Sequence, residues 1–402
     1  PMTDSTSPQL RRSLGFWALV FYGVGDILGA GIYALVGKVA GVAGSASWAA
    51  FAVALLVAGL TALTYAELGG RFPRSAGESF FTQQALGALV PELPQSVTVV
   101  GILLLLAAIN FRGMRESSMT NIVATMVELT GLLIVIVAGA IFLSDTPGAS
   151  ISHTIASSSE VSWNSIARGA ALGFFAFIGF EDMVNVAEEV KDPERNMPRA
   201  ILIALVVTGL VYLLVVIVAT TVVAPTTLAG SEAPLLTVVQ RATDAVPDRL
   251  FTLIALFAVA NTGLLNFIMG SRLIYGMSRQ GLLPSALGAV HPKRQTPHLA
   301  ILTVLAVALA LALSGTLTYL AGTTSLLLLL VFFTVNLSLI AIKRRDRKPL
   351  RTFCAPRLIP LAGALSCLGL MPFVPADSLL TAGVILALGA GIVGLNSRRS
   401  AA

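Results

Sequence analysis

Long apolar runs dominate this sequence and restrict the folds open to it. A transmembrane helix needs about 20 consecutive, mainly apolar residues. Eleven candidate runs lie at 14–40, 48–70, 97–111, 119–143, 163–187, 200–224, 250–271, 299–314, 318–342, 357–374 and 378–395. Only 11% of the residues are charged, whereas a soluble domain carries roughly 25%. The sequence therefore predicts an all-α polytopic membrane protein with about 11 transmembrane helices.

Basic residues are grouped in the short segments between these runs, and they indicate the orientation. The groups are Arg11/Arg12, Arg71/Arg74, Arg112/Arg115, Lys191/Arg195/Arg199, Arg272/Arg279/Lys293/Arg294, Lys343 to Arg351 and Arg398/Arg399. The positive-inside rule places all of them, and the N-terminus, in the cytoplasm. The net charge of +6 is explained by these loops and implies no nucleic-acid partner. The first run could also suit a signal peptide, but ten further runs favour an uncleaved span.

One pair of neighbouring basic groups does not fit the count of crossings. Two groups on the same side must be separated by an even number of crossings, yet a single run, 97–111, lies between Arg74 and Arg112. Either the polar stretch 80–93 makes the second crossing, or everything before residue 95 is inverted, or a helix is missing. We favour a missing helix.

Two of the spans contain glycines together with an acid. The stretch from Tyr22 to Ile32 has four glycines and Asp26, and Gly179 comes just before Glu181 and Asp182. Glycine weakens a helix by up to about 1 kcal/mol relative to alanine, so both spans could break in the membrane. Paired broken helices are the best sequence pointer to a transport site at the middle of the membrane.

Each of these stretches also has a simpler interpretation. Gly25 and Gly29 form a GxxxG pair, which is typical of a packing face between helices. The other span could end near Phe180 and leave Glu181 and Asp182 in water.

Glu128 is an isolated acid inside the run 119–143, with no basic residue three or four positions away. A charge in hydrocarbon is expensive and normally faces protein or water. The functional interpretation is a proton or ion carrier, and the alternative is a neutral, hydrogen-bonded structural glutamate.

Several classes of function lack their sequence signals. Cys354 and Cys367 can build neither a disulfide framework nor a zinc site, and no metal site is expected. There is no HExxH, GxSxG or cofactor motif, so we expect neither an enzyme nor a bound cofactor. No segment resembles an ion-selectivity filter.

Residues 225–248 predict a short amphipathic helix on the outer face, with apolar positions at Leu235, Leu236, Val239 and Ala242.

Five stretches together resemble the amino acid/polyamine/organocation superfamily, in the branch of bacterial amino acid permeases. They are GDILGAGIYAL at 25–35, TYAELGGRFPRSAGE at 64–78, NFRGMRESSMTN at 110–121, FFAFIGFEDMVNVAEEVKDPERNMPRA at 174–200 and SRLIYGMSRQGLLP at 271–284. The resemblance implies one transporter domain, 1–402, with a five-plus-five inverted repeat. The first repeat would cover 1–143, the second 163–342, and two trailing helices 357–395.

The resemblance also implies the site. Helices one and six would unwind at the middle of the membrane, with free backbone at Gly29, Ala30, Gly31 and Ile32 binding the substrate carboxylate. Backbone around Phe177, Ile178 and Gly179 would bind the amino group, and Phe175 would be the aromatic gate. Half-helix N-termini suit a carboxylate and free carbonyls suit an ammonium group.

Three acids are the implied coupling and gating residues. Glu181 matches a family acid linked to gating and coupling, and Glu128 stands where several relatives carry lysine on helix five. Asp26 stands where relatives often carry asparagine or an apolar residue, which suggests a cationic substrate or a proton role. In the family a third helix follows the loop at Arg71 to Phe81, so this chain would lack helix three.

We therefore expect a secondary active transporter of amino acids in the bacterial inner membrane. It would work by alternating access, coupled to protons or to a counter-substrate, and contact membrane lipid. One alternative is an impaired or non-transporting shortened paralogue that binds ligand or an intact partner. Another is a polyamine or a cationic amino acid as the substrate.

Overall fold

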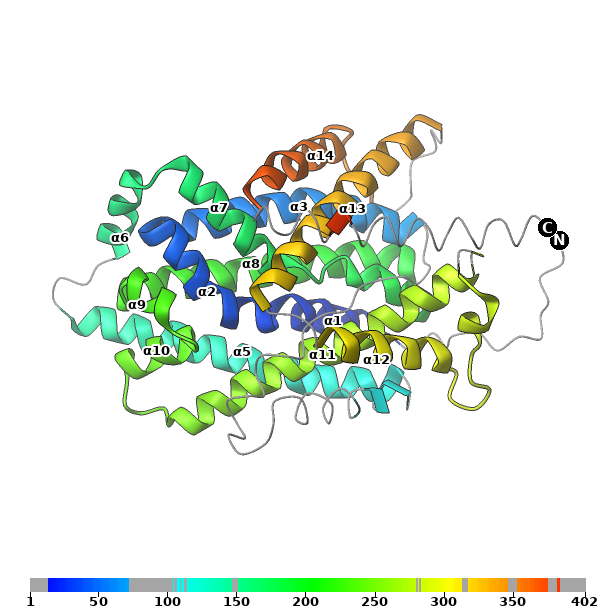
Figure 1. Cartoon of the computed structure of the whole chain (residues 1–402), viewed down its shortest axis with the longest axis horizontal. Helices are drawn as coiled ribbons and strands as arrows, with labels where there is room; N and C mark the ends of the chain where they lie inside the picture. Colours follow the sequence, from blue (N-terminus) through cyan, green and yellow to red (C-terminus); the bar gives the residue numbers. More distant parts are fainter. Residues whose placement is uncertain are drawn as a thin grey trace.

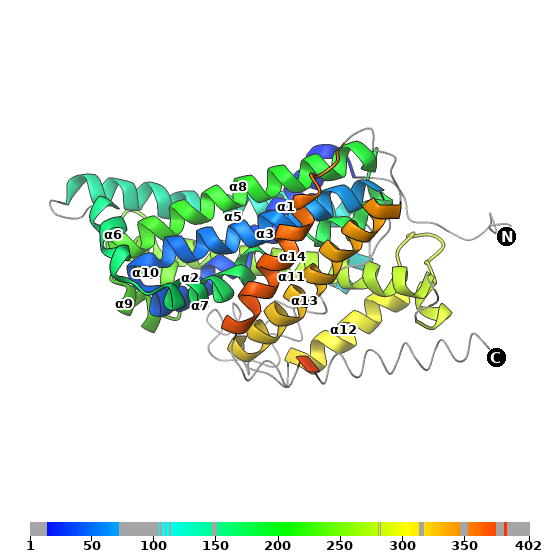
Figure 2. The ribbon, with the colours of Figure 1, turned by 90° about the horizontal axis from the view of Figure 1, so that it is seen from above.

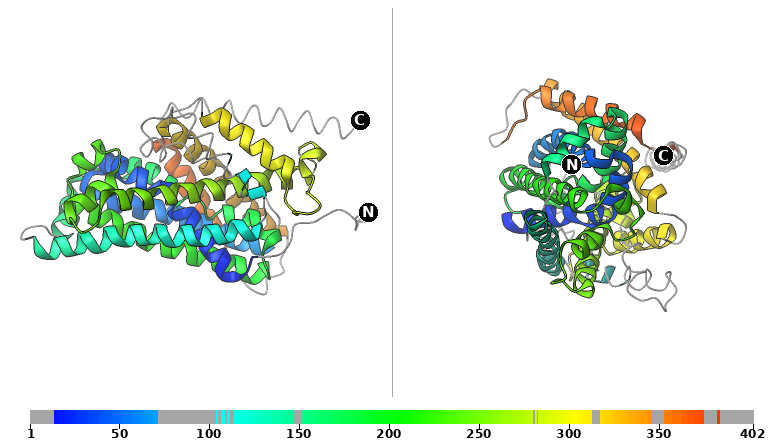
Figure 3. Two further views of the ribbon diagram at one scale, coloured as in Figure 1. Left: turned by 90° about the horizontal axis from the view of Figure 1, so that it is seen from below. Right: turned by 90° about the vertical axis from the view of Figure 1, so that its left-hand side faces the viewer.

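The structure is a computed structural model that describes residues 14–71, 114–146, 151–279, 283–312, 317–345 and 353–374, with a few single positions elsewhere. Within these residues the chain is helical, and its only extended pairing is an isolated bridge between Leu14 and Val190. Most helices run along one common direction, and the end-on view in Figure 3 shows them as a bundle.

The first half of the described chain contains both interrupted spans. In order, its elements are α1 (Phe16–Leu28), α2 (Ala30–Ala43), η1 (Gly44–Ala46), α3 (Ser47–Arg71), α5 (Met114–Asp145), α6 (Ile151–Ser157), η2 (Ser158–Glu160), α7 (Trp163–Phe174), η3 (Phe175–Phe177) and η4 (Asp182–Glu189), where η marks a 3₁₀-helix. The second half has α8 (Pro193–Val222), α9 (Pro225–Gly230), α10 (Pro234–Ala242), α11 (Asp248–Arg279), η5 (Ser285–Gly288), α12 (His298–Ala312), α13 (Leu317–Arg345), α14 (Leu358–Leu370) and η6 (Met371–Phe373).

Seven helical segments of the described chain are long and apolar enough to cross a membrane. They are Phe16–Tyr33, Leu35–Leu68, Asn121–Asp145, Trp163–Glu189, Pro193–Val222, Asp248–Arg279 and Thr323–Arg344, and two shorter apolar helices lie at His298–Leu309 and Leu358–Phe373. These segments coincide with nine of the eleven predicted runs. The other two, 97–111 and 378–395, lie almost wholly outside the described residues. The chain is a multi-pass, all-helical membrane protein, as predicted.

The interrupted helix formed by α1 and α2 lies at the centre of the bundle. In Figure 1 it runs between α3, α7, α13 and α14 on one side and α5, α11 and α12 on the other. The α1 segment packs against α5, α8 and α11, and α2 packs against α7. Figure 2 shows α13 and α14 side by side, and both also pack against α3. Most of the first span, Phe16–Tyr33, is buried, because most of its residues are small or apolar.

The predicted amphipathic helix is α10. Its Leu235 and Val239 are buried, as predicted, together with Val238, whereas Leu236 and Ala242 are half-buried. The preceding turn, α9, packs on α2, where Gly41 lies against Ala229. The α9–α10 segment therefore covers one end of the central helix. The division into repeats 1–143 and 163–342 and trailing helices 357–395 stays a prediction.

Candidate functional site

The first break lies at Gly29. The α1 helix ends at Leu28 and α2 begins at Ala30, while Gly29 has φ −47° and ψ −149°, which is not helical. No side chain caps the start of α2. The N–H groups of Ala30, Gly31 and Ile32 are therefore in the first turn of a helix, where backbone donors have no partner in the helix and carry a partial positive charge.

The second break lies at Ile178 and Gly179. Phe177 ends a 3₁₀ turn, Ile178 is extended (φ −65°, ψ 141°), and Gly179 has φ +129°, which side-chain-bearing residues rarely adopt. The chain then continues as the 3₁₀-helix η4. The carboxylate of Glu181 accepts a hydrogen bond from the Gly179 N–H at 3.0 Å. Both predicted interruptions are confirmed.

The two breaks touch each other through glycines. A Cβ placed on Gly179 would lie 2.9 Å from the carbonyl carbon of Asp26 and 3.0 Å from the nitrogen of Ile27. A Cβ on Gly31 would lie 2.7 Å from the Cα of Ala176. Contacts this short leave no room for a side chain at either position. Glycine is therefore required where the first interrupted helix meets the second.

The two glycines of the GxxxG pair have a packing role as well. Gly25 lies against Asn121 and Thr125 of α5 and Asn261 of α11. Gly29 lies against the hydroxyl of Thr262 on α11. The interpretation as a packing face and the interpretation as a helix break thus both hold, at neighbouring residues of the same segment.

Three acids are buried beside the breaks. Asp26, Glu181 and Asp182 are each at most 4% exposed, so the interpretation that the second span ends in water is wrong. The side chains of Asp26 and Asp182 lie close enough to interact. One oxygen of Asp26 and one of Glu181 are buried with no hydrogen-bond partner among the described residues. The breaks therefore bring together carboxyl groups from both interrupted helices.

Glu128 is buried on α5, which packs against α1. Neither oxygen of its carboxyl group has a hydrogen-bond partner within the described part of the chain. Its backbone carbonyl accepts a hydrogen bond of 3.2 Å from the Tyr33 hydroxyl. The carboxyl group is close enough to Asp26 for their charges to interact. Glu128 thus belongs to the same acidic neighbourhood, and the side chain of Asn261 on α11 also lies beside its carboxyl group.

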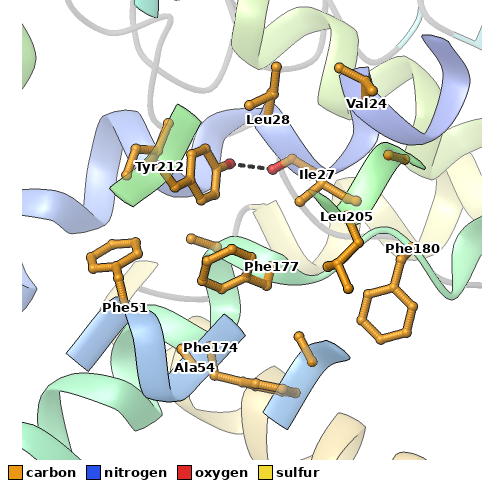
Figure 4. Packing of buried hydrophobic residues seen from close by; sticks show 14 of the residues in the cluster. Val24, Ile27, Leu28, Phe51, Ala54, Phe174, Phe177, Phe180, Leu205 and Tyr212 are labelled. Carbon is orange, nitrogen blue, oxygen red and sulfur yellow. Dashed lines mark hydrogen bonds between the residues drawn. The ribbon is translucent and has the colours of Figure 1, made fainter. Parts of the chain in front are cut away.

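Two phenylalanines of the predicted site have different surroundings. Phe175 is buried in a small apolar cluster with Leu35 and Ile178, separate from the main core. Phe177 is wholly buried, and its ring packs against the rings of Phe51 and Tyr212 (Figure 4). The Phe177 ring is therefore taken up by the core, and only the backbone of this residue is left for a ligand. Ile32 is also buried in the main core.

Some residues at or near the breaks were not in the predicted site. Tyr212 donates a hydrogen bond to the carbonyl oxygen of Ile27, and its one sequence signal is a hydroxyl inside the apolar run 200–224. The sequence shows Asp182 beside Glu181 but indicates no role for it. The charge pattern predicts Arg272 in a cytoplasmic loop, but the residue lies inside α11 and is wholly buried. Its Nε lies 3.0 Å from the Glu189 carboxylate.

One protein family and two individual relatives are similar to this chain in sequence. The amino acid permease family matches residues 86–395. An uncharacterized transporter of Mycobacterium tuberculosis (strain ATCC 25618 / H37Rv) is 31% identical, covering 96% of this chain and 92% of the relative. The branched-chain amino acid permease BcaP of Bacillus subtilis (strain 168) is 26% identical over 424 aligned positions, covering 91% of this chain and 89% of the relative.

A solved structure has a similar fold. It is MHP1, a nucleobase-cation-symport-1 family transporter in a closed conformation with bromovinylhydantoin bound. The two structures superpose with a TM-score of 0.50, at 14% sequence identity, over 92% of this chain and 95% of MHP1. At this identity the likeness concerns the fold alone.

Proposed function

Because this chain belongs to the amino acid permease family, we propose that it carries amino acids across the membrane through a site between its two helix breaks. It acts as a secondary transporter, not an enzyme, and works by alternating access. The observation that carries the proposal is the contact between the breaks: Gly179 lies against the peptide group joining Asp26 and Ile27. A ligand bound to backbone groups at both breaks would be sensitive to any movement of one interrupted helix against the other.

The backbone chemistry suits a small zwitterion. The uncapped N–H groups of Ala30, Gly31 and Ile32 start a half-helix, whose partial positive charge favours a carboxylate. The backbone of Phe177, Ile178 and Gly179 leaves the helical path, and carbonyls in such a segment suit an ammonium group. We assign the aromatic gate to Phe175, which packs beside Ile178 and Leu35.

Coupling is assigned to the buried acids. Asp26, Glu128 and Glu181 each have at least one buried oxygen without a hydrogen-bond partner among the described residues. The two buried ion pairs of the described chain join Arg272 to Glu189 and Lys343 to Glu67. A buried carboxyl group lacking a cation can be relieved by binding a proton. Proton-coupled uptake is the first expectation, and exchange against a counter-substrate is the second.

The acids beside the two breaks favour one other candidate substrate. Asp26, Asp182 and Glu181 put negative charge at the meeting point of the breaks, which suits a polyamine or the side chain of a cationic amino acid. The shortened, non-transporting paralogue is less favoured, because the relatives named above are transporters. We place the protein in the bacterial inner membrane, with the N-terminus in the cytoplasm, on the positive-inside rule.

Uptake of radiolabelled amino acids into proteoliposomes tests the proposal. Wild-type protein should take up label under an inward proton gradient, whereas Gly179→Leu should lose most of the uptake because its side chain would collide with the Asp26 backbone. Gly369→Leu is the matched control, because a Cβ there meets nothing within 4 Å. Uptake by Gly179→Leu at the wild-type rate would refute the site.

Competition in the same assay separates the two substrate classes. Unlabelled leucine, arginine and putrescine are added in turn at equal excess. A zwitterion site predicts that leucine competes, whereas a site selective for cations predicts competition by arginine or putrescine only. Binding without any flux would instead support the non-transporting paralogue.

A further inference from the structure

The hydroxyl of Tyr212, on α8, donates a hydrogen bond to the backbone carbonyl oxygen of Ile27 (Figure 4). In a continuous helix that carbonyl would accept a hydrogen bond from the N–H group four residues later, at Gly31. Because α1 ends at Leu28 and Gly29 is not helical, the Ile27 carbonyl is among the last four of its helix, which have no partner within it. Tyr212 supplies the hydrogen bond that the break removes.

The ring of Tyr212 reaches the second break. Tyr212 is completely buried, and its ring centroid lies 5.3 Å from that of Phe177 and 6.3 Å from that of Phe51. The rings of Phe51 and Phe177 are themselves 6.1 Å apart. These distances and tilts fall in the range that aromatic pairs favour. Phe177 directly precedes Ile178 and Gly179, so a single side chain contacts both interrupted helices.

The two contacts fall on opposite sides of the same residue. Gly179 lies against the peptide nitrogen of Ile27: a Cβ placed on Gly179 would lie 3.0 Å from that nitrogen. Tyr212 holds the carbonyl of Ile27, on the side that leads to Gly29. Fixing both peptide groups of Ile27 sets the direction in which the chain leaves α1, and therefore the place where α2 starts.

We propose that Tyr212 is a positioning residue for transport. It holds the first break so that the N–H groups at the start of α2 are aligned before the substrate arrives. A site aligned in advance binds more tightly, because less ordering is left to occur on binding. This inference rests on the proposed function, which assigns those N–H groups to the substrate carboxylate. Tyr212 itself is not expected to touch the substrate.

The test is Tyr212→Phe, which keeps the ring packing and removes only the hydroxyl. Two measurements are made: the kinetics of uptake for the amino acid that wild-type protein takes up fastest, and amide hydrogen–deuterium exchange across residues 26–32. We expect KM to rise about three- to tenfold, the range for one lost hydrogen bond, with the maximal rate changed less than twofold. Exchange across 26–32 should become faster.

Tyr275→Phe is the control for removing a buried tyrosine hydroxyl. Tyr275 lies in α11 and is buried against Ala300, in a cluster separate from the main core. It should leave both KM and the exchange of residues 26–32 unchanged.

Unchanged exchange in Tyr212→Phe would overturn the proposal, because the hydroxyl would then not hold the break. Faster exchange with an unchanged KM would also overturn it, since Tyr212 would then support the fold without positioning substrate. The exchange measurement needs no substrate. An absence of uptake by wild-type protein would therefore refute the proposed function and still leave the role of Tyr212 at the break open to measurement.

Discussion

Gly179 combines two requirements that only glycine meets. Its φ of +129° lies where side-chain-bearing residues are strained, and its Cα faces the backbone of Asp26 without space for a methyl group. A backbone neighbour cannot move aside as a flexible side chain can. At the scale of single residues, the meeting of the two interrupted helices therefore depends on the absence of a side chain at 179, and likewise at Gly31.

Glu128 leads to a prediction at the same scale. A carboxyl group that gains a proton on one side of the membrane and releases it on the other can couple uptake to a proton gradient, whereas an amide cannot titrate. Glu128→Gln should therefore abolish stimulation of uptake by an inward proton gradient and preserve exchange of labelled for unlabelled substrate. Uptake at pH 6 outside and pH 8 inside, compared with equal pH, measures the effect.

The control for Glu128→Gln is Glu160→Gln, which changes an exposed acid in η2. It should retain the gradient stimulation. If Glu128→Gln retains it as well, Glu128 has no part in coupling.

At the scale of elements, the C-terminal end of the second interrupted helix contacts both α11 and the segment that precedes α1. Glu189, the last residue of η4, pairs with Arg272 of α11, and its carbonyl accepts a hydrogen bond of 2.9 Å from the Leu14 N–H. Arg272 also donates to Asn110 Oδ1 at 2.8 Å. The segment leading into α1 is thus held beside η4 and α11, and these contacts must separate if that end of the bundle opens.

The Arg272–Glu189 pair predicts a non-additive effect on stability. Arg272→Met leaves a buried carboxylate without its cation, and removing one partner of a buried pair costs about 3–5 kcal/mol. Replacing both partners with apolar residues, as in Arg272→Met with Glu189→Leu, should recover most of that loss. Thermal unfolding of the purified proteins in detergent measures the melting temperatures. A double variant that is no more stable than Arg272→Met would contradict the prediction.

At the scale of the whole molecule, orientation in the membrane can be read from a native cysteine. Cys354 is exposed in the segment between α13 and α14, whereas Cys367 is buried in α14. Because the basic stretch Lys343 to Arg351 is predicted to be cytoplasmic, a membrane-impermeant maleimide should label Cys354 in inside-out vesicles and not in intact cells. Cys354→Ser should abolish the labelling. Labelling of intact cells would reverse the orientation.

The missing third helix is also a question about the whole chain, and residues 72–103 lie outside the described ranges. The alignment with BcaP has 424 positions but includes only 91% of a 402-residue chain. Several tens of positions of the relative therefore stand opposite gaps in this chain, enough for one crossing of about 20 residues and its loops. This supports a missing helix without locating it.

We predict that the missing segment belongs between Gln84 and Leu89. Inserting there the corresponding helix of BcaP should raise the uptake rate or the melting temperature, because helix three would restore an even number of crossings between Arg74 and Arg112. Protein with the insertion is compared with the chain as it stands. Impairment of both properties would argue that this chain folds as a complete unit without that helix.

The amino-acid sequence by itself determined the membrane class and the positions of the described spans, because both follow from local composition. It offered each of the two helix breaks as one of two interpretations. An apolar run of sufficient length must cross, and glycines beside an acid weaken the helix that contains them. The resemblance in five stretches pointed to the family that the comparisons then showed. Contacts between residues on different helices could not be predicted from local composition.

Only the tertiary structure decided that Gly179 lies against Asp26 and Ile27, that Tyr212 holds the Ile27 carbonyl, and that Phe177 faces the core. It also paired Arg272 with Glu189 and Lys343 with Glu67, two cations that the sequence pattern had assigned to loops. These contacts join residues distant along the chain. They depend on how helices pack in three dimensions, which the periodicity of one segment does not encode.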